Sequence, residues 1–469
     1  MKRYHSFSLI FLAAFTTITC TVFSQSGEPH PDLLRGPYLQ MATPTSMTIR
    51  WRTNALDRSR VRYGTDAGKL TSVIDDSTLV TEHIVNLEKL QPYTKYYYAI
   101  SSYKDTLQSG ADNYFYTLPE AGSTMPLRIA ALGDCGNNSA NQRNVRDEVQ
   151  KYLGTNELNA WILLGDNAYA SGTDAEFQAK FFNIYKDNLL KKVPLFPSPG
   201  NHDYRDIESA GKKDEYKIAY YRNFSLPVNG EAGGVPSHAQ AYYSFDIGNV
   251  HFLSLDSYGK DETGKSMINE DGAQVAWVKK DLAANKNRTW VIAYFHHPPY
   301  TMGSHDSDKE TLLVKIRENF IKVLEDEGVD LVLNGHSHVY ERSRLMKGYF
   351  GMERDFDSLK YNLSSSSALY DGSKNSVPYI KSAKKTDGTV YVVSGSAGAQ
   401  GGAKATYPHN AMFYSNNQVG GAVMLEVTGN MLNLKWICAD GAIRDNFTMM
   451  KEVSAKDEKL LKKDKRLGE

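Results

Sequence analysis

The sequence predicts two folded parts, an all-β domain followed by a larger α/β domain. Between residues 33 and 118, short stretches alternate apolar and polar residues, with turn residues about every ten positions, which is typical of an antiparallel β-sandwich. After the turn-rich segment 119–126, apolar strands alternate with amphipathic helical segments, which indicates an α/β domain. The 469 residues are more than one compact domain usually needs.

The first part is predicted to contain five strands, at residues 46–53, 59–65, 83–90, 95–103 and 113–118. Leu90, Pro92, Thr94 and Tyr96 form a pattern that resembles the tyrosine corner of fibronectin type III domains. Trp51 is the candidate core aromatic residue. We therefore expect a fibronectin-like sandwich, with any other β-sandwich as the alternative.

The second part alternates strands with helices, which are predicted at residues 140–153, 174–188, 272–284 and 309–326. Residues 421–451 are expected to close it as antiparallel strands. We place the first domain at residues 25–120 and the second at 121–451. The charged run at 452–469 is expected to be a solvated tail.

The N-terminus has the pattern of a secretory signal peptide over residues 1–24. Lys2 and Arg3 precede an apolar run at 7–15, and small residues follow near Ser24. The mature protein is therefore expected to be secreted or periplasmic. A lipid anchor on Cys20 is a minority alternative, because the residues before it lack the usual lipobox pattern.

Composition favours a small-molecule substrate. Lysine plus arginine equals aspartate plus glutamate, 54 against 54, so there is no global basic field for nucleic acid or an anionic membrane. No later segment has the 18 apolar residues of a transmembrane helix. Once the signal is removed, Cys135 and Cys438 remain, too few for a disulfide framework, and we expect both to be unpaired and at least partly buried.

Polar side chains of metal-binding type follow five predicted strands. They are Asp134, Asp166, Tyr169, Asn201, His202, His296, His336 and His338. In an α/β sheet, ligands bind beyond the carboxyl ends of the strands. A single Asp or Asn there often only caps the next helix, but five strand ends that all carry metal-ligand side chains favour a metal site.

His336 and His338 are two positions apart, so in an extended segment both imidazoles point the same way. At a strand end, each ring can then reach a different ion. Two ions about 3.5–4 Å apart that share one carboxylate form the clamp used for in-line phosphoryl displacement.

Five motifs in order, at residues 133–136, 165–169, 200–203, 296–300 and 335–342, resemble those of the purple acid phosphatases, a branch of the calcineurin-like metallophosphoesterases. Residues 35–40 are similar to the opening strand of that family, so the resemblance spans both domains. It implies a fibronectin-like domain followed by an αββα four-layer sandwich, in which two sheets are flanked by helices.

The resemblance implies seven metal ligands. Asp134, Asp166, Tyr169 and His338 would hold a ferric ion, and Asp166, Asn201, His296 and His336 would hold a divalent ion. Asp166 would bridge the two. Ordinary metallophosphoesterases have a histidine where this chain has Gly136, and Tyr169 supplies the missing ligand. The divalent ion could be zinc, ferrous iron or manganese.

The implied reaction is hydrolysis of phosphate monoesters, in which metal-bound hydroxide attacks phosphorus in line. His202 and His305 are the residues expected to protonate the leaving group. A phosphodiesterase or nucleotide pyrophosphatase on the same metal core is the alternative. A cell-surface binding protein with a vestigial site is a third hypothesis, against which the complete ligand set argues. The oligomeric state stays open, with a homodimer as one option.

Other polar residues have structural interpretations. Asp203 replaces the usual glutamate of the family, and the Cys135 thiol is expected to be buried and inert. His251 and His83 are expected in the core, with bonded nitrogens. Surface or loop positions are expected for His30, His238 and His409. His297 is expected to be a bystander of the metal site. We expect a salt-bridged loop at Glu341 and Arg342.

Overall fold

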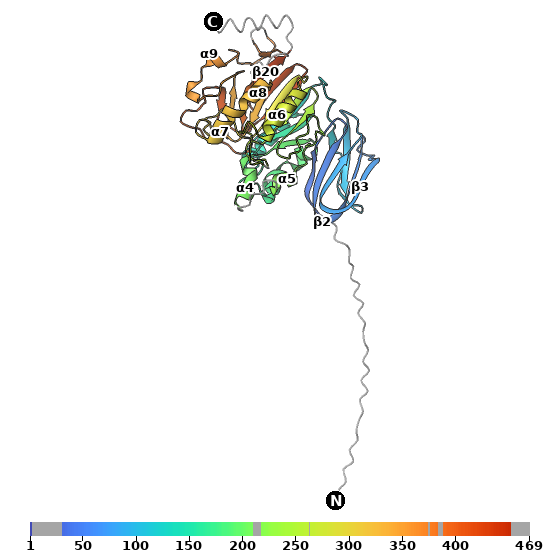
Figure 1. Cartoon of the computed structure of the whole chain (residues 1–469). Helices are drawn as coiled ribbons and strands as arrows, with labels where there is room; N and C mark the ends of the chain where they lie inside the picture. Colours follow the sequence, from blue (N-terminus) through green and yellow to red (C-terminus); the bar gives the residue numbers. More distant parts are fainter. Residues whose placement is uncertain (2–30, 210–216, 262, 374–375, 383–387, 452–469) are drawn as a thin grey trace.

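A computed structural model describes residues 1, 31–209, 217–261, 263–373, 376–382 and 388–451. An N-terminal β-domain lies beside a larger domain of sheets and helices (Figure 1). The predicted signal peptide, apart from Met1, and the predicted charged tail both lie outside the described residues, as does His30. Among the described helices, none combines the length and the apolar character that a membrane span requires.

The N-terminal domain is one connected sheet of six strands. They are β1 (Leu33–Gln40), β2 (Met47–Gly64), β3 (Ser72–Leu87), β4 (Lys95–Ser101), β5 (Thr106–Gln108) and β6 (Tyr114–Tyr116). The Tyr96 hydroxyl accepts a hydrogen bond from the Gln91 N–H at 3.0 Å, and Trp51 is fully buried, so the corner and the core aromatic residue are found as predicted. The two short strands predicted at 46–53 and 59–65 are instead one strand, β2. Register shifts near Asp57 bend that strand without ending it.

The second domain contains two seven-stranded sheets. The first has the order β15 (Tyr379–Lys381), β20 (Ile443–Lys451), β19 (Met431–Cys438), β18 (Gly421–Thr428), β7 (Leu127–Leu132), β8 (Ala160–Leu164) and β9 (Leu195–Ser198). The second has the order β10 (Tyr243–Ile247), β11 (Val250–Ser254), β12 (Trp290–Tyr294), β13 (Leu331–Asn334), β16 (Val390–Ser394), β14 (Tyr340–Ser343) and β17 (Met412–Asn416). The strands β7, β8 and β9 are parallel, and so are β11, β12, β13 and β16.

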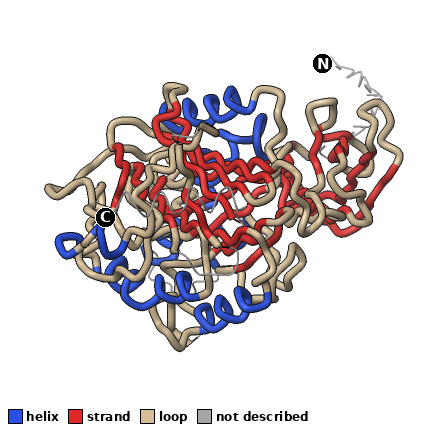
Figure 2. The backbone as a smooth tube through the Cα atoms, turned by 90° about the horizontal axis from the view of Figure 1, so that it is seen from above, coloured by secondary structure: helices blue, strands red, loops and turns tan. Residues whose placement is uncertain are grey.

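Helices cover the outer faces of the two sheets. They are α1 (Ala140–Leu153), the continuous α2 (Asp174–Glu176), η1 (Phe177–Phe182), α3 (Asn183–Tyr185) and η2 (Lys186–Leu190), then α4 (Asn201–Ser209), α5 (Ala219–Asn223), α6 (Ala273–Ala284), the continuous α7 (Thr311–Lys315), η4 (Ile316–Phe320) and α8 (Ile321–Asp326), then η5 (Glu353–Asp355) and α9 (Ser358–Tyr361). Figure 2 shows the strands in the middle, with helices on either side. The four predicted helical segments all form helices.

The strand β12 shows why four layers form. Its residues alternate, so Ile292 and Tyr294 join the core between the two sheets, whereas Val291 and Ala293 join a second core that includes Val278 of α6. A strand that is apolar on both faces needs a covering layer on each side. The predicted αββα sandwich is therefore confirmed.

One local prediction was wrong. Glu341 and Arg342 lie in the buried strand β14 and not in a loop, although Arg342 does pair with Asp445, at 2.6 Å. His409 is in a loop as predicted but is fully buried, whereas His238 is exposed. Glu341 and Arg342 are buried against Thr301 and Asp445, partners from distant parts of the chain that local sequence does not show.

Candidate metal centre

The candidate ligands gather where parallel strands end. Asp134 follows the end of β7 by two residues, Asp166 follows β8, His296 follows β12 and His336 follows β13, each by the same interval. Asn201, three residues after the end of β9, begins α4. Because parallel strands end at one edge of their sheet, and the two sheets are stacked, side chains from both sheets meet at one site.

Glycines allow this close approach. A Cβ atom on Gly335 would lie 2.5 Å from Oδ2 of Asp134, and one on Gly200 would lie 2.3 Å from the nitrogen of Asp166. Real Cβ atoms almost never come so near a neighbour. The glycines of these motifs are therefore required by packing at the site, in addition to any role in turning the chain.

His296 is the centre of one half of the site. Its Nδ1–H donates to the Leu164 carbonyl at 2.8 Å, so Nε2 is the nitrogen left to hold a proton or a cation. That Nε2 lies 3.1 Å from Oδ1 of Asn201, 3.3 Å from Oδ1 of Asp166 and 3.3 Å from Nδ1 of His336. Three atoms that can act as acceptors therefore face Nε2, and a single proton on Nε2 could satisfy only one of these contacts. A cation between them would satisfy all four atoms, so the donor set fits a metal ion.

Tyr169 is the centre of the other half. Its hydroxyl lies 2.9 Å from Oδ1 of Asp134 and 3.3 Å from Nε2 of His338. Burial, together with the charges of Asp134 and Asp166, raises the pKa of Tyr169, so without a cation this side chain is a neutral phenol. The backbone N–H of His336 donates to the other oxygen of Asp134 at 2.8 Å, which fixes the carboxylate.

The buried carboxylates attract positive charge. Burial alone would lower the pKa of His296, but the charges of Asp166 and Asp134 raise it to about 9. Burial would raise the pKa of Asp166, yet the charge of His296 holds it below its usual range. Ligand atoms of Asp134, Asp166 and His296 lie within 4.8 Å of one another. This spacing and this charge suit a bound cation.

The two predicted proton donors line the same site. His202 donates from Nδ1 to the Ala170 carbonyl at 2.6 Å, and its ring lies 4.4 Å from that of Tyr169. Burial lowers the pKa of His202, although the charge of Asp166 acts in the opposite direction. His305 bonds through Nδ1 to Glu310 at 2.9 Å and stacks on His336, with ring centroids 3.7 Å apart. Both imidazoles are partly exposed.

Sequence reasoning missed Glu310. Its carboxylate binds His305 and also lies 3.6 Å from Nε2 of His336, a buried nitrogen with no hydrogen-bond partner among the described residues. Glu310 therefore links a candidate proton donor to a candidate ligand. The only signal in the sequence is its position just before α7, where an acidic residue is usually explained by capping.

His297 is a third imidazole at this site. It is buried, its Nδ1 lies 2.8 Å from the Ser257 hydroxyl, and its ring centroid is 4.3 Å from that of His336. A ligand atom of His297 lies within 4.8 Å of ligand atoms of His296 and His336. The sequence interpretation as a bystander stays a prediction, but the ring packs directly against both neighbouring histidines.

Asp203, which departs from the family pattern, and the Cys135 thiol are both buried. Asp203 accepts hydrogen bonds from the Gly200 N–H at 2.8 Å and from the Asn167 amide at 3.0 Å, and burial raises its pKa to about 8. Burial also raises the pKa of the Cys135 thiol to about 12. Cys135 and Cys438, the cysteines that the structure describes, are buried and unpaired, as predicted.

Comparisons with known proteins agree with this architecture. Residues 127–340 match the calcineurin-like phosphoesterase model, and residues 35–117 match the model of the purple acid phosphatase N-terminal domain. Purple acid phosphatase 15 of Arabidopsis thaliana is 30% identical over 292 residues, which cover 57% of this chain and 50% of that protein. Acid phosphatase type 7 of Mus musculus is 27% identical over 402 residues, 79% of each chain.

Among solved structures, the purple acid phosphatase PPD1 from yellow lupin seeds matches with a TM-score of 0.66 and 18% identity, covering 90% of this chain and 75% of that chain. This likeness shows the shared fold. The fold and the two model matches together define a calcineurin-like metallophosphoesterase. More specifically, the N-terminal match and the curated relatives show that the chain belongs to the purple acid phosphatase family, whose enzymes have a dinuclear metal centre.

Proposed function

We propose that the chain is an exported acid phosphatase that hydrolyses phosphate monoesters at a bridged pair of metal ions. The proposed ligands are Asp134, Asp166, Tyr169, Asn201, His296, His336 and His338. One observation carries the proposal: Nε2 of His296 lies within 3.3 Å of acceptor atoms of Asn201, Asp166 and His336, with its other nitrogen already committed to a carbonyl. Removal of the predicted signal peptide would accompany export.

The donor types suggest which ions bind. Tyr169, as a phenolate, is a hard anionic donor that favours ferric iron, and Asp134 adds a second charge beside it. The other half offers two imidazoles, an amide oxygen and a carboxylate, which suit zinc, ferrous iron or manganese. Once bound, such a pair supplies Lewis acidity and a water molecule of lowered pKa.

The chain's own residues position the substrate and move its proton. Both proposed proton donors, His202 and His305, use Nδ1–H to bind a fixed acceptor, so a further proton can sit only on Nε2. That atom can reach the oxygen of a leaving alcohol bound beside the ions. Asp166 lies against His202, with 3.8 Å between Oδ2 and Nε2, which keeps the ring close to the centre.

The test combines metal analysis, a visible spectrum and substrate comparison on the purified mature protein. We expect one iron and one divalent ion per chain, a broad absorption band, and faster hydrolysis of an aryl phosphate monoester than of the diester. The Tyr169→Phe variant should lose the band. A colourless, fully zinc-loaded protein would contradict the iron assignment, and preferential diester cleavage would favour the phosphodiesterase alternative.

A second test separates catalysis from metal binding. The double variant His202→Ala, His305→Ala should lose turnover while keeping both metals and the absorption band. His238→Ala is the matched control, because His238 is exposed on a loop, and it should behave as the wild type. Loss of metal from the double variant would show that the two histidines are structural. Metal bound without any turnover by the wild type would favour the binding-protein hypothesis.

A further inference from the structure

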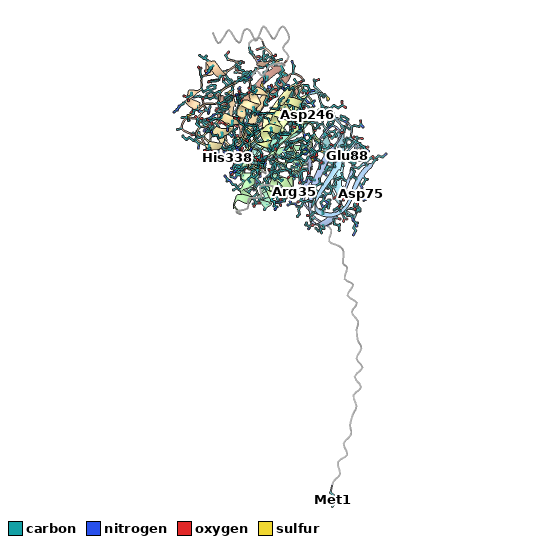
Figure 3. The ribbon with its side chains drawn as sticks, viewed as in Figure 1. Met1, Arg35, Asp75, Glu88, Asp246 and His338 are labelled. Atoms are coloured by element: carbon teal, nitrogen blue, oxygen red, sulfur yellow. The ribbon has the colours of Figure 1, made fainter. Side chains whose placement is uncertain are left out.

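The N-terminal domain contacts the second domain through two arginines that bind one aspartate. Asp174 is the first residue of α2, and its Oδ1 lies 3.1 Å from Nη2 of Arg35 and 3.0 Å from Nη2 of Arg52. Nη1 of Arg52 bonds the other carboxylate oxygen. Arg35 lies at the junction of the two domains (Figure 3). The paired guanidinium groups therefore anchor the start of α2 to the N-terminal sheet.

The Arg35 side chain is fully buried, and each of its nitrogens has a partner. Its Nε donates to Gln178 at 2.8 Å, Nη1 donates to Asn223 at 2.6 Å, and Nη2 donates to Asp174. A buried guanidinium with every nitrogen bonded holds its partners in a defined geometry. These hydrogen bonds therefore hold the contact between the two domains in one geometry.

The helix α2 in turn holds the segment that follows Tyr169. Glu176 accepts hydrogen bonds from the N–H groups of Ala170 at 2.6 Å, Ser171 at 2.9 Å and Thr173 at 3.3 Å. The Thr173 hydroxyl accepts from the Glu176 N–H, which completes a capping box. Asp174 and Glu176 share one helical turn, so an anchor on Asp174 also fixes the carboxylate of Glu176.

Residues 169–173 include one group of the proposed active site, Tyr169, and bind a second, His202. Tyr169 presents its hydroxyl to Asp134, and the Ala170 carbonyl accepts from Nδ1 of His202 at 2.6 Å. Lys180 bonds both the Tyr169 carbonyl and Glu176. A displacement of residues 169–173 would therefore move a proposed ligand and a proposed proton donor together.

We propose that the N-terminal β-domain is a positioning element of the active site. Arg35 and Arg52, through Asp174, hold residues 169–173 in the geometry that presents Tyr169 and orients His202. This inference goes beyond the proposed function. Only the measurement of kcat and KM in its test rests on the proposed function. A misplacement of about 1 Å at a catalytic group can cost on the order of a hundredfold in rate.

Other contacts keep the domains together when one arginine is removed. The Tyr38 hydroxyl donates to the Asn223 carbonyl at 2.8 Å, and the Tyr98 hydroxyl donates to the Lys191 carbonyl at 2.8 Å. Arg50 donates to the Arg222 carbonyl at 2.7 Å. An Arg52 variant is therefore expected to stay folded and docked, so that its effect on residues 169–173 can be measured.

The test compares Arg52→Gln with two matched controls. Arg60→Gln removes the pair that Arg60 forms with Asp75 at 2.6 Å within the same N-terminal domain (Figure 3 labels Asp75). Glu82→Gln neutralises the other acidic partner of Arg52. Each protein is examined by amide hydrogen exchange over residues 169–176, by kcat and KM for an aryl phosphate, and by its melting temperature.

We expect Arg52→Gln to speed exchange at 169–176 at least tenfold and to lower kcat about tenfold, with KM and melting temperature near the wild-type values. Both controls should match the wild type. The conservative variant Arg52→Lys, which keeps a positive charge beside Asp174, should retain part of the exchange protection and of kcat. Unchanged exchange in Arg52→Gln, or equal changes in the controls, would overturn the inference. A wild-type protein without phosphatase activity would refute the proposed function, while exchange would still decide the positioning role.

Discussion

His251 forms a buried ion cluster that supports the second sheet. Its Nδ1 lies 2.8 Å from Asp246 of β10, and its Nε2 lies 2.6 Å from Asp281 of α6 (Figure 3 labels Asp246). His251 and Asp281 are fully buried, and Arg288 also pairs with Asp246, at 2.7 Å. Because each nitrogen of the His251 ring faces a carboxylate, both nitrogens must carry a proton to donate. The prediction that His251 is a core residue with bonded nitrogens is confirmed.

Replacing His251 with alanine should strongly destabilise the protein, because it leaves a buried carboxylate without its cation. Asp281 would keep only neutral partners, the Ser244 hydroxyl at 2.9 Å and the Val235 N–H at 2.7 Å. Removing one partner of a buried ion pair costs about 3–5 kcal/mol. With about 2.1 cal/mol/K of unfolding entropy per residue, a domain of roughly 330 residues should melt about 4–7 °C lower.

The pH dependence gives a second criterion. Burial lowers the pKa of His251, but the bonds to Asp246 and Asp281 raise it above its unfolded value of about 6.5. Its stabilisation is therefore fully present below about pH 6.5 and is lost as pH rises through the folded pKa. The difference in melting temperature between wild type and His251→Ala should shrink as the pH becomes alkaline.

His83 provides the matched control. It is also buried, but its ring bonds two hydroxyls, those of Thr53 and Ser59, each at 2.9 Å, and burial lowers its pKa to about 4. His83→Ala should therefore destabilise the protein less than His251→Ala does. Its pH dependence should be opposite, because the stability advantage of the wild type over His83→Ala is lost as pH falls below about 6.5. Scanning calorimetry at pH 5, 7 and 8.5 measures both variants. A loss below about 2 °C for His251→Ala, or a difference that grows with pH, would refute the reasoning.

Three further outcomes are expected. Gly335→Ala should abolish metal binding in elemental analysis, because the added Cβ would lie 2.5 Å from the carboxylate of a proposed ligand. The control Gly68→Ala should bind metal normally, because its Cβ would meet no atom nearer than 3.5 Å. Glu310→Ala should weaken divalent-metal affinity about 10- to 100-fold in a chelator competition, and unchanged affinity would show that its contact with the ligand histidine is incidental. Cys135 and Cys438 should resist iodoacetamide at pH 8 until the protein is unfolded, as judged by mass spectrometry, and rapid native labelling would contradict their burial.

Much of the architecture could be predicted from local pattern. The helix predicted at 140–153 has those same bounds, because Ser139 caps its start and Gly154 ends it. The tyrosine corner at Tyr96 was also predictable from its short motif. The continuity of β2 was not predictable, because a bulge near Asp57 and the end of a strand look alike in a polar stretch of sequence.

The ligand types at the strand ends, their glycines and the alternation of strands and helices are properties of the sequence alone, because each depends on neighbouring residues. They sufficed to indicate a site and its chemistry. Only the tertiary structure places Glu310 between His305 and His336, packs His297 against His336 and brings Arg52 to Asp174. These contacts join residues from different elements, and their distances depend on how sheets and domains pack. No local periodicity encodes that packing.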